Sequence, residues 1–206
     1  MPDFQIEREI SQAGFKAIAG LDEVGRGALF GPVVAASVIF SQSLIQRRLA
    51  DWLKEVKDSK RLSPTKRTRL AKQIVDSAEA VGIGLASHRE IDRKNIHWAS
   101  LEAMKRAFAS MPQNPDFLLV DGFRLNDVNY PQMHVLKGDQ KSISIAAASI
   151  VAKVFRDEMI VRLDSVFHGY ALIKNKGYGT NEHFKALREL GPSALHRRSF
   201  NLEGKI

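Results

Sequence analysis

Apolar and polar residues alternate along the chain in a pattern that predicts strands and helices in turn. Short runs rich in Val, Ile, Leu and Ala predict buried strands. Longer stretches with apolar residues three or four positions apart predict amphipathic helices. The expected strands are 17–21, 33–40, 81–87, 117–120 and 133–136. The expected helices are 44–56, 64–80, 96–111, 142–167 and 181–190.

This order of elements predicts one α/β domain over residues 1–206. The first half of the helix at 142–167, SISIAAASIVA, is apolar nearly all round, so this helix should be buried, with its Ala and Ser residues permitting close packing. A Gly/Tyr-rich loop and a further helix follow, so residues from about 168 to 206 are expected to form a small C-terminal helical extension.

The composition narrows the chemistry that the chain can perform. It has 206 residues, 44% hydrophobic and 26% charged, which is typical of a globular domain. It contains no Cys, so disulfides, thiolate metal sites and cysteine nucleophiles are excluded, and any metal must bind to oxygen or imidazole. No apolar stretch reaches the roughly 20 residues of a membrane span, and the first residues do not resemble a secretory signal. We therefore expect a soluble, cytoplasmic protein with no membrane partner.

The net charge of +8 favours a polyanionic partner, with nucleic acid the leading candidate. Between residues 60 and 72 there are six basic residues and no acidic one. This segment is either a solvated helix face or a strip that faces phosphates.

Four acidic residues stand in apolar surroundings at or near the ends of predicted strands. They are Asp22, Glu23, Asp121 and Asp139. Each of them alone is explained by an acid that caps a turn. If the strands are neighbours in one sheet, the carboxylates instead converge on a hard divalent cation, Mg²⁺ or Mn²⁺. Such a site suits in-line displacement at phosphorus, with the ions activating water and stabilising the leaving oxygen.

The adjacent positions of Asp22 and Glu23 create a geometric problem, because neighbours on a regular strand point to opposite faces. Both can serve one site if the strand ends or bulges there, as Gly25 would allow. The following segment, GRGALFGP, differs from a dinucleotide-binding fingerprint in its glycine spacing and leads into a strand. Its glycines permit close approach of the backbone to a ligand, or simply form a tight turn.

Several blocks of the sequence together resemble the bacterial ribonuclease HII family, the type 2 ribonucleases H. The resemblance rests on GLDEVGRG with GPVVAA, DSKRLS, LVDG, KGDQKSISIAAASIVAKVFRD, GYGTNEH and the final HRRSF, in family order along nearly the whole chain. It implies a ribonuclease H-like mixed sheet flanked by helices. The loop residues Leu172 and Asn175, and GALFGP in place of the more usual GPLAGP, depart from the family pattern.

The resemblance implies a metal-dependent endonuclease that cuts the RNA strand of RNA/DNA hybrids and duplex DNA containing ribonucleotides, leaving 3′-hydroxyl and 5′-phosphate ends. It implies a role in ribonucleotide removal and DNA repair or replication. The catalytic and metal-binding residues carry over as Asp22, Glu23, Asp121 and Asp139. The substrate-binding residues carry over as Gly25, Arg26 and Gly27 at the ribose 2′-hydroxyl, Tyr178 on the neighbouring sugar, and Ser59, Lys60 and Arg61 at phosphates.

Two further residues of the resemblance have open roles. Asp157 is either a support for the site or a partner in a helix salt bridge, and His183 is expected to form a structural hydrogen bond. A non-catalytic hybrid-binding protein and a metal-dependent DNA nuclease remain competing classes. We expect a monomer.

Overall fold

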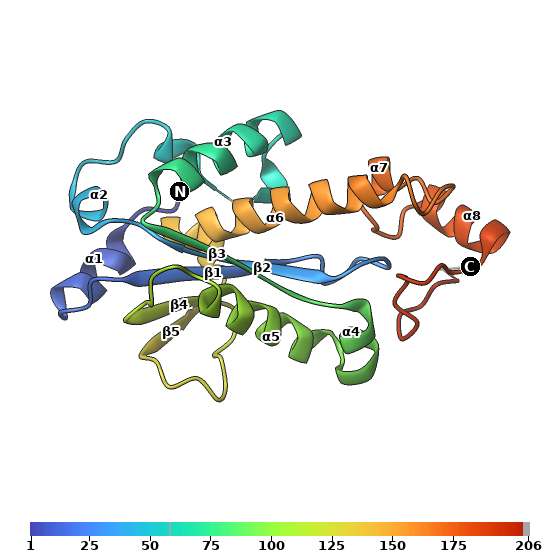
Figure 1. Cartoon of the computed structure of the whole chain (residues 1–206). Coiled ribbons are helices and arrows are strands. Elements are labelled where there is room, and N and C mark those ends of the chain that lie inside the picture. Colours follow the sequence, from blue (N-terminus) through green and yellow to red (C-terminus); the bar gives the residue numbers. More distant parts are fainter. Residues whose placement is uncertain (58, 204–206) are drawn as a thin grey trace.

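The protein is described by a computed structural model over residues 1–57 and 59–203. Five strands form one mixed sheet in the order β3–β2–β1–β4–β5 (Figure 1). The central strand β1 (Ile18–Val24) pairs antiparallel with β2 (Val33–Ile39) and parallel with β4 (Phe117–Asp121). At the edges, β3 (Ala80–Ala86) is antiparallel to β2, and β5 (Gln132–Val135) is parallel to β4. The predicted α/β class and the five predicted strands are therefore confirmed.

Helices cover both faces of the sheet, as Figure 1 shows. The long helix α6 (Ile143–Leu163) and α3 (Pro64–Ser77) lie on one face, and α5 (Ile96–Ala109) lies on the other. Alternate residues of β1 and β2 supply the two apolar layers: Val34, for example, packs toward α6 and Val33 toward α5. A sheet buried on both faces explains why its strands read as continuous apolar runs.

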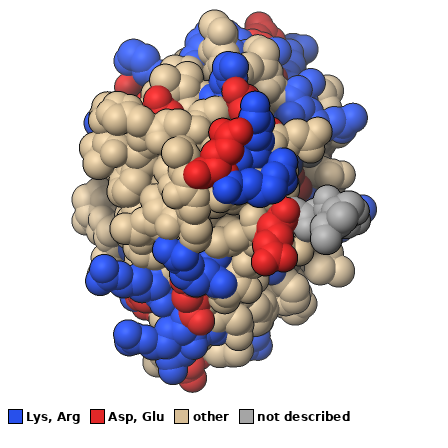
Figure 2. Space-filling model, turned by 90° about the vertical axis from the view of Figure 1, so that its right-hand side faces the viewer, with Lys and Arg blue, Asp and Glu red and all other residues tan. Residues whose placement is uncertain are grey.

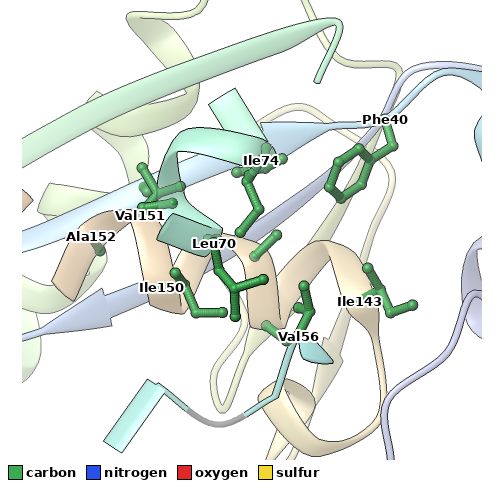
Figure 3. Packing of buried hydrophobic residues seen from close by; sticks show 14 of the residues in the cluster. Phe40, Val56, Leu70, Ile74, Ile143, Ile150, Val151 and Ala152 are labelled. Carbon is green, nitrogen blue, oxygen red and sulfur yellow. The ribbon is translucent and has the colours of Figure 1, made fainter. Parts of the chain in front are cut away.

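The predicted burial of the long helix is confirmed in the layer between α3 and α6. Leu70 and Ile74 of α3 pack with Ile150 and Val151 of α6 (Figure 3). Where α6 crosses β1, a Cβ added at Gly20 would lie 2.2 Å from the backbone of Ser144. Glycine is thus required for the strand and the helix to approach so closely.

Two helices follow α6 in the chain and pack together in a small helical unit. It contains α7 (Leu172–Asn175) and α8 (Asn181–Leu190), which pack with Phe30 and Ile160 in an apolar cluster of their own. Figure 2 views the molecule from this end and shows acidic side chains interspersed among the lysines and arginines.

The helix predicted over 44–56 is wrong. The segment forms only α2 (Gln42–Gln46) and a 3₁₀ turn η1 (Leu53–Glu55). Arg8 donates hydrogen bonds to the carbonyl oxygens of Ile45, at 2.8 Å, and Arg47, at 3.2 Å. A tertiary contact therefore binds carbonyl groups that would otherwise accept bonds within the helix.

Three of the described helices were not predicted from the pattern, among them the short α7, which lies within the expected Gly/Tyr-rich loop. Helix α1 (Gln5–Gln12) precedes the first strand, and α4 (His88–Lys94) begins with a capping box formed by Ser87 and Glu90. The 3₁₀ turn η2 (Ser59–Arg61) lies within the DSKRLS block, whose Asp58 is outside the described residues. Helix α6 ends at Leu163, four residues before the predicted boundary of 167. Within the described part of the chain, none of the helices has the length and apolar character needed to cross a bilayer.

Candidate active site

Asp22 and Glu23 lie inside β1, which continues to Val24. Of the two alternatives for these adjacent acids, a bulge is absent from this segment of the described chain, because the register of β1 on β2 is continuous from Ala19 to Val24. The pairing of β1 with β4 ends at Leu21 instead. Both carboxylates line one pocket at this end of the strand, so the two adjacent acids reach a common site without a bulge.

Asp121 and Asp139 reach the same pocket from the neighbouring strands. Asp121 is the last residue of β4, and Asp139 lies in the 3₁₀ turn η3 (Gly138–Gln140) that follows β5. The Gly138 amide donates a hydrogen bond of 2.6 Å to Oδ1 of Asp121, which ties the two acidic segments together.

The pocket has a volume of about 310 Å³ and joins the acids to most of the predicted recognition residues. Its lining contains the four carboxylates together with Gly25, Arg26, Gly27, Ser59, Lys60 and Tyr178. Arg61, the remaining predicted phosphate contact, is not among the lining residues. The residues that the sequence singled out are therefore gathered at one site, with Arg61 as the exception.

The carboxylates in this pocket repel one another. Burial raises the pKa of Asp22 well above its ordinary value, and the charges of Glu23 and Asp121 raise it further. Burial also raises the pKa of Asp121, and the negative charge of Glu23 raises it further. The hydrogen bond from Gly138 and the positive charges of Lys60 and Arg26 lower this pKa, but they do not cancel the increase. The site therefore favours the arrival of positive charge.

The donor set fits a hard divalent cation. Among the described residues that line the pocket, the side-chain oxygens belong to carboxylates and hydroxyls, and neither Cys nor His contributes a side chain. Within residues 1–57 and 59–203, no three His, Asp or Glu side chains are gathered tightly enough to enclose an ion. The case for a divalent cation in this pocket therefore rests on its oxygen ligands and on the repulsion between the carboxylates, which a cation would relieve.

A pair of serines supports the most buried of the four acids. Ser149 of α6 forms a side-chain hydrogen bond to Asp22, which lowers the pKa of that carboxyl against the effect of burial. The hydroxyl of Ser59 lies 3.0 Å from that of Ser149. Ser59 is thus buried and bonded within the protein, and sequence reasoning missed Ser149, which it treated as a small packing residue.

The segment GRGALFGP, residues 25–32, forms a glycine loop whose backbone conformation depends on its contact with α6. Gly25 has φ of +91°, a conformation that favours glycine, and an added Cβ would lie 2.2 Å from Nε of Arg156. Arg26 pairs with Glu23 at 2.9 Å between Nη1 and Oε1, and its guanidinium lies 6.0 Å from the ring of Phe123. The loop therefore presents Arg26 directly beside Glu23, one of the four carboxylates of the pocket.

Two buried arginines bind the carbonyl groups of this loop. Arg156 donates to the carbonyl oxygens of Phe30 and Pro32 in the loop, and to that of Lys176 outside it. Arg197 donates to Arg26 and Gly31. Burial lowers the pKa of both guanidinium groups, that of Arg197 to about 9. Sequence reasoning placed Arg156 and Arg197 in family blocks but gave neither of them a role.

Tyr178 lies between the pocket and helix α6. Its ring centroid is 5.0 Å from Nζ of Lys153 and 5.3 Å from Cζ of Arg156. Its backbone forms an antiparallel bridge with Ala28, so the aromatic residue is attached to the glycine loop. The cations beneath the ring hold it in place while one side borders the pocket.

Much of the basic segment over 60–72 is bonded within the protein. Lys66 and Arg69 both pair with Glu55, at 2.6 and 2.8 Å. Arg67 is buried and donates to the carbonyl oxygens of Ser59 and Leu62. The segment is thus neither a purely solvated face nor a continuous strip of exposed cations.

The two residues with open roles take part in structural contacts. Asp157 pairs with Lys153 one turn earlier on α6, at 2.8 Å, and with Arg67 at 3.5 Å. The helix salt bridge expected for it is present. The Nδ1 atom of His183 lies 2.9 Å from the carbonyl oxygen of Tyr178, which confirms the expected structural hydrogen bond.

Solved structures place this arrangement of sheet and helices in a known class. Ribonuclease H2 from Pyrococcus horikoshii OT3 matches with a TM-score of 0.72 and 26% identity, covering 90% of this chain and 94% of that one. The RNase HII of the PCNA:RNase HII complex from Archaeoglobus fulgidus matches with a TM-score of 0.73 and 26% identity, covering 92% and 98%. The fold is therefore that of the ribonuclease H-like nucleases, as the resemblance implied.

Sequence comparison narrows this class to one family. The Ribonuclease HII family model matches residues 19–203. Ribonuclease HII of Acaryochloris marina is 54% identical over 184 residues, covering 89% of this chain and 91% of that protein. Ribonuclease HII of Moorella thermoacetica is 49% identical over 194 residues, covering 94% and 91%. The chain belongs to the ribonuclease HII family, and it is a divalent-metal-dependent ribonuclease H acting on RNA/DNA hybrids.

Proposed function

We propose that the protein also cuts duplex DNA on the 5′ side of an embedded ribonucleotide, leaving a 3′-hydroxyl and a 5′-phosphate. The observation that carries this proposal is the shared pocket, in which four carboxylates border the glycine loop and Tyr178. Metal-binding acids and groups that can contact a ribose lie in the same cavity. This arrangement suits the recognition of a single ribonucleotide at the point of cleavage. Its biological role would be the removal of ribonucleotides during DNA repair or replication, by a monomer.

In this proposal Asp22, Glu23, Asp121 and Asp139 hold Mg²⁺ or Mn²⁺. Their charges would be offset by a cation held there, which would supply activation of water and stabilisation of the leaving 3′ oxygen. Asp22 is the most enclosed of the acids, because Ser149 and the Glu23 amide both donate to it. This fixed carboxylate gives the site a rigid edge against which the scissile phosphate is aligned.

In this proposal different recognition residues contact different parts of the substrate. Backbone groups of Gly25, Arg26 and Gly27 contact the 2′-hydroxyl, which distinguishes RNA from DNA. Tyr178 stacks on the adjoining sugar. Ser59, Lys60 and Arg61 contact phosphates, with Lys60 already at the pocket and Arg61 outside its lining.

The test uses a DNA duplex with one ribonucleotide and an all-DNA duplex of the same sequence, in Mg²⁺, in Mn²⁺ and with chelator. We expect a metal-dependent cut 5′ to the ribonucleotide, with the all-DNA duplex intact. The Asp121→Asn variant should lose cleavage and retain binding, while Asp76→Asn on the exposed face of α3 should cut normally. Cleavage of the all-DNA duplex, or turnover by Asp121→Asn, would refute the proposal.

A further inference from the structure

Two histidines form a buried pair outside the pocket. His183 belongs to α8, and His196 belongs to the segment 193–197 that follows it. Both side chains are buried, with 0% and 1% exposure. Their Nε2 atoms lie 3.0 Å apart, so one ring must donate to the other.

The surrounding groups permit a single arrangement of protons on the four ring nitrogens. Nδ1 of His183 faces the carbonyl oxygen of Tyr178, which only accepts, so this nitrogen carries a proton. In a neutral ring, Nε2 of His183 is then the acceptor, and Nε2 of His196 carries the proton between them. Nδ1 of His196 is therefore unprotonated, and it accepts hydrogen bonds from the amide and the hydroxyl of Ser193 at 2.9 and 2.8 Å. Every ring nitrogen is thus satisfied when both rings are neutral.

An additional proton has no favourable position in this pair. On Nδ1 of His196 it would oppose the Ser193 amide, and on Nε2 of His183 it would oppose the proton of His196. The rings of Tyr170 and Phe30 pack against His196, with centroids at 4.8 and 5.1 Å. Burial lowers the pKa of His183 and His196, and that of His196 falls to about 4, with the charges of His183 and Arg198 adding to the effect.

The segment that contains His196 also holds the glycine loop. The backbone of His196 forms a bridge with Phe30, and the Arg197 amide donates to the carbonyl of Leu29 at 2.8 Å. Nη1 of Arg197 donates to the carbonyl of Arg26, also at 2.8 Å. The same short segment therefore contacts both recognition elements: Tyr178 through His183, and the glycine loop through Arg197.

We propose that His183 and His196 are positioning residues, whose fixed proton arrangement holds the Tyr178 segment against the glycine loop. This inference rests on the proposed role of Tyr178 in substrate recognition. Among the described residues that line the pocket, Tyr178 is the one to which the pair is hydrogen-bonded. The pair therefore acts on binding of the ribonucleotide and leaves the chemical step to the carboxylates.

The pair makes the fold sensitive to acid in a predictable direction. An unfolded histidine binds a proton near pH 6.5, whereas the folded pair resists it. The unfolded state therefore binds more protons between pH 6.5 and about 4, and the stability of the fold falls as the pH is lowered through this range. Loss of the pair's geometry should release Tyr178 at the same time.

The first experiment measures cleavage of the single-ribonucleotide duplex by His196→Ala and His196→Gln at pH 8. The alanine removes the donor to His183, whereas the glutamine amide can replace it. We expect His196→Ala to raise KM by about tenfold, because Tyr178 is no longer held through His183, with kcat nearly unchanged. His196→Gln should stay near wild type, as should His168→Ala, which alters an exposed histidine.

A double variant separates positioning from a general loss of structure. In the Tyr178→Ala background, His196→Ala should raise KM no further, because the group being positioned is already gone. Equal increases in both backgrounds, or a fall in kcat alone, would overturn the proposal.

Imidazole ¹⁵N NMR of the wild-type protein tests the proton arrangement independently of activity. At pH 6 we expect neutral rings, with the proton on Nδ1 of His183 and on Nε2 of His196. The opposite tautomers, or a charged ring, would overturn the inference even if the enzyme cuts as proposed. If the wild type leaves the single-ribonucleotide duplex intact, the proposed function fails, while the NMR result still decides the state of the pair.

Discussion

The backbone amide of Gly138 donates a 2.6 Å hydrogen bond to Oδ1 of Asp121. This bond joins the end of β4 to the turn that carries Asp139, so two acids 18 positions apart in the sequence share one local structure. The approach is close because Gly138 lacks a side chain. An added Cβ would lie 2.5 Å from Cδ1 of Ile145 and 3.2 Å from Asp121 itself.

The substitution Gly138→Ala should therefore displace Asp121 and Asp139 relative to each other. We expect a loss of about 1–3 kcal/mol in stability from overpacking and at least a tenfold fall in kcat. Hybrid-cleavage kinetics and urea unfolding measure the two effects.

A second substitution tests the steric explanation. Ile145→Val removes Cδ1, the atom that the new methyl group would strike, so the double variant Gly138→Ala/Ile145→Val should recover much of the lost activity. If the double variant is as inactive as Gly138→Ala, the crowding against Ile145 is not the cause.

The fold and the four acids could be predicted because their signals are local. A short apolar run predicts a buried strand. An acidic residue directly after such a run can be identified from the local sequence alone, without knowledge of the rest of the chain. Asp22 and Asp121 were identified in this way, and the structure brings both to one pocket. The failed helix over 44–56 shows the limit, because Arg8, far away in the sequence, binds its carbonyl groups.

The supporting residues of the site could not be predicted, because their partners are distant. Arg156 binds the carbonyl of Phe30, 126 positions earlier, and Arg197 binds that of Gly31, 166 positions earlier. A buried arginine that binds carbonyl groups has the same local sequence as an exposed one. Ser149 lies among alanines on α6, where its spacing indicates only close packing.

Removing the charge of Asp22 should stabilise the protein while it abolishes activity. The ionised carboxylate is buried beside Glu23 and Asp121, so Asp22→Asn relieves desolvation and repulsion, and its amide oxygen can still accept from the Glu23 amide. We expect Tm without metal to rise by about 2–4 °C, the shift for roughly 1 kcal/mol in a chain of this size. Thermal unfolding with chelator measures this rise.

The same variant should respond less to metal. Millimolar Mg²⁺ should raise the Tm of the wild type by stabilising the folded state, and this increase should shrink in Asp22→Asn. A variant that is less stable than the wild type in chelator would contradict the repulsion described for the pocket.

Asp157 should matter for stability and substrate affinity more than for the chemical step. It holds Lys153, whose ammonium lies over the ring of Tyr178, and it also pairs with Arg67. We expect Asp157→Asn to cost about 1 kcal/mol and to raise KM several-fold with a small change in kcat. Asp76→Asn is the matched control: it weakens the Lys72–Asp76 pair, which has the same spacing but lies on an exposed face. This control variant should change neither the stability nor KM. A kcat loss as large as that of Asp121→Asn would instead place Asp157 in the catalytic step.

Glu7 is a buried acid outside the pocket, and it connects α1 to the start of α6. Its Oε1 accepts from the Ser142 hydroxyl at 2.6 Å and from the Ser144 amide at 3.0 Å. Glu7→Ala removes both bonds and should cost about 2 kcal/mol or more, because it leaves donors buried at the helix start. Glu9→Ala on the same helix, where the acid makes an exposed contact with Gln5, should cost much less.

Glutamine at position 7 separates the hydrogen bonds from the charge. Burial raises the pKa of Glu7 above its ordinary 4.5, so the folded protein holds a proton there more tightly than the unfolded chain does. This contribution is complete at low pH and is lost as the pH rises through the folded pKa. Glu7→Gln keeps the acceptor oxygen without a titratable group, so its stability relative to wild type should increase from pH 5 to pH 8. Urea unfolding of both proteins at pH 5 and pH 8 measures the difference between their free energies of unfolding. The titratable groups that both proteins share contribute equally to each and cancel in this difference. A relative stability that falls with pH would show that the ionised carboxylate is the favoured form, held by the N-terminus of α6.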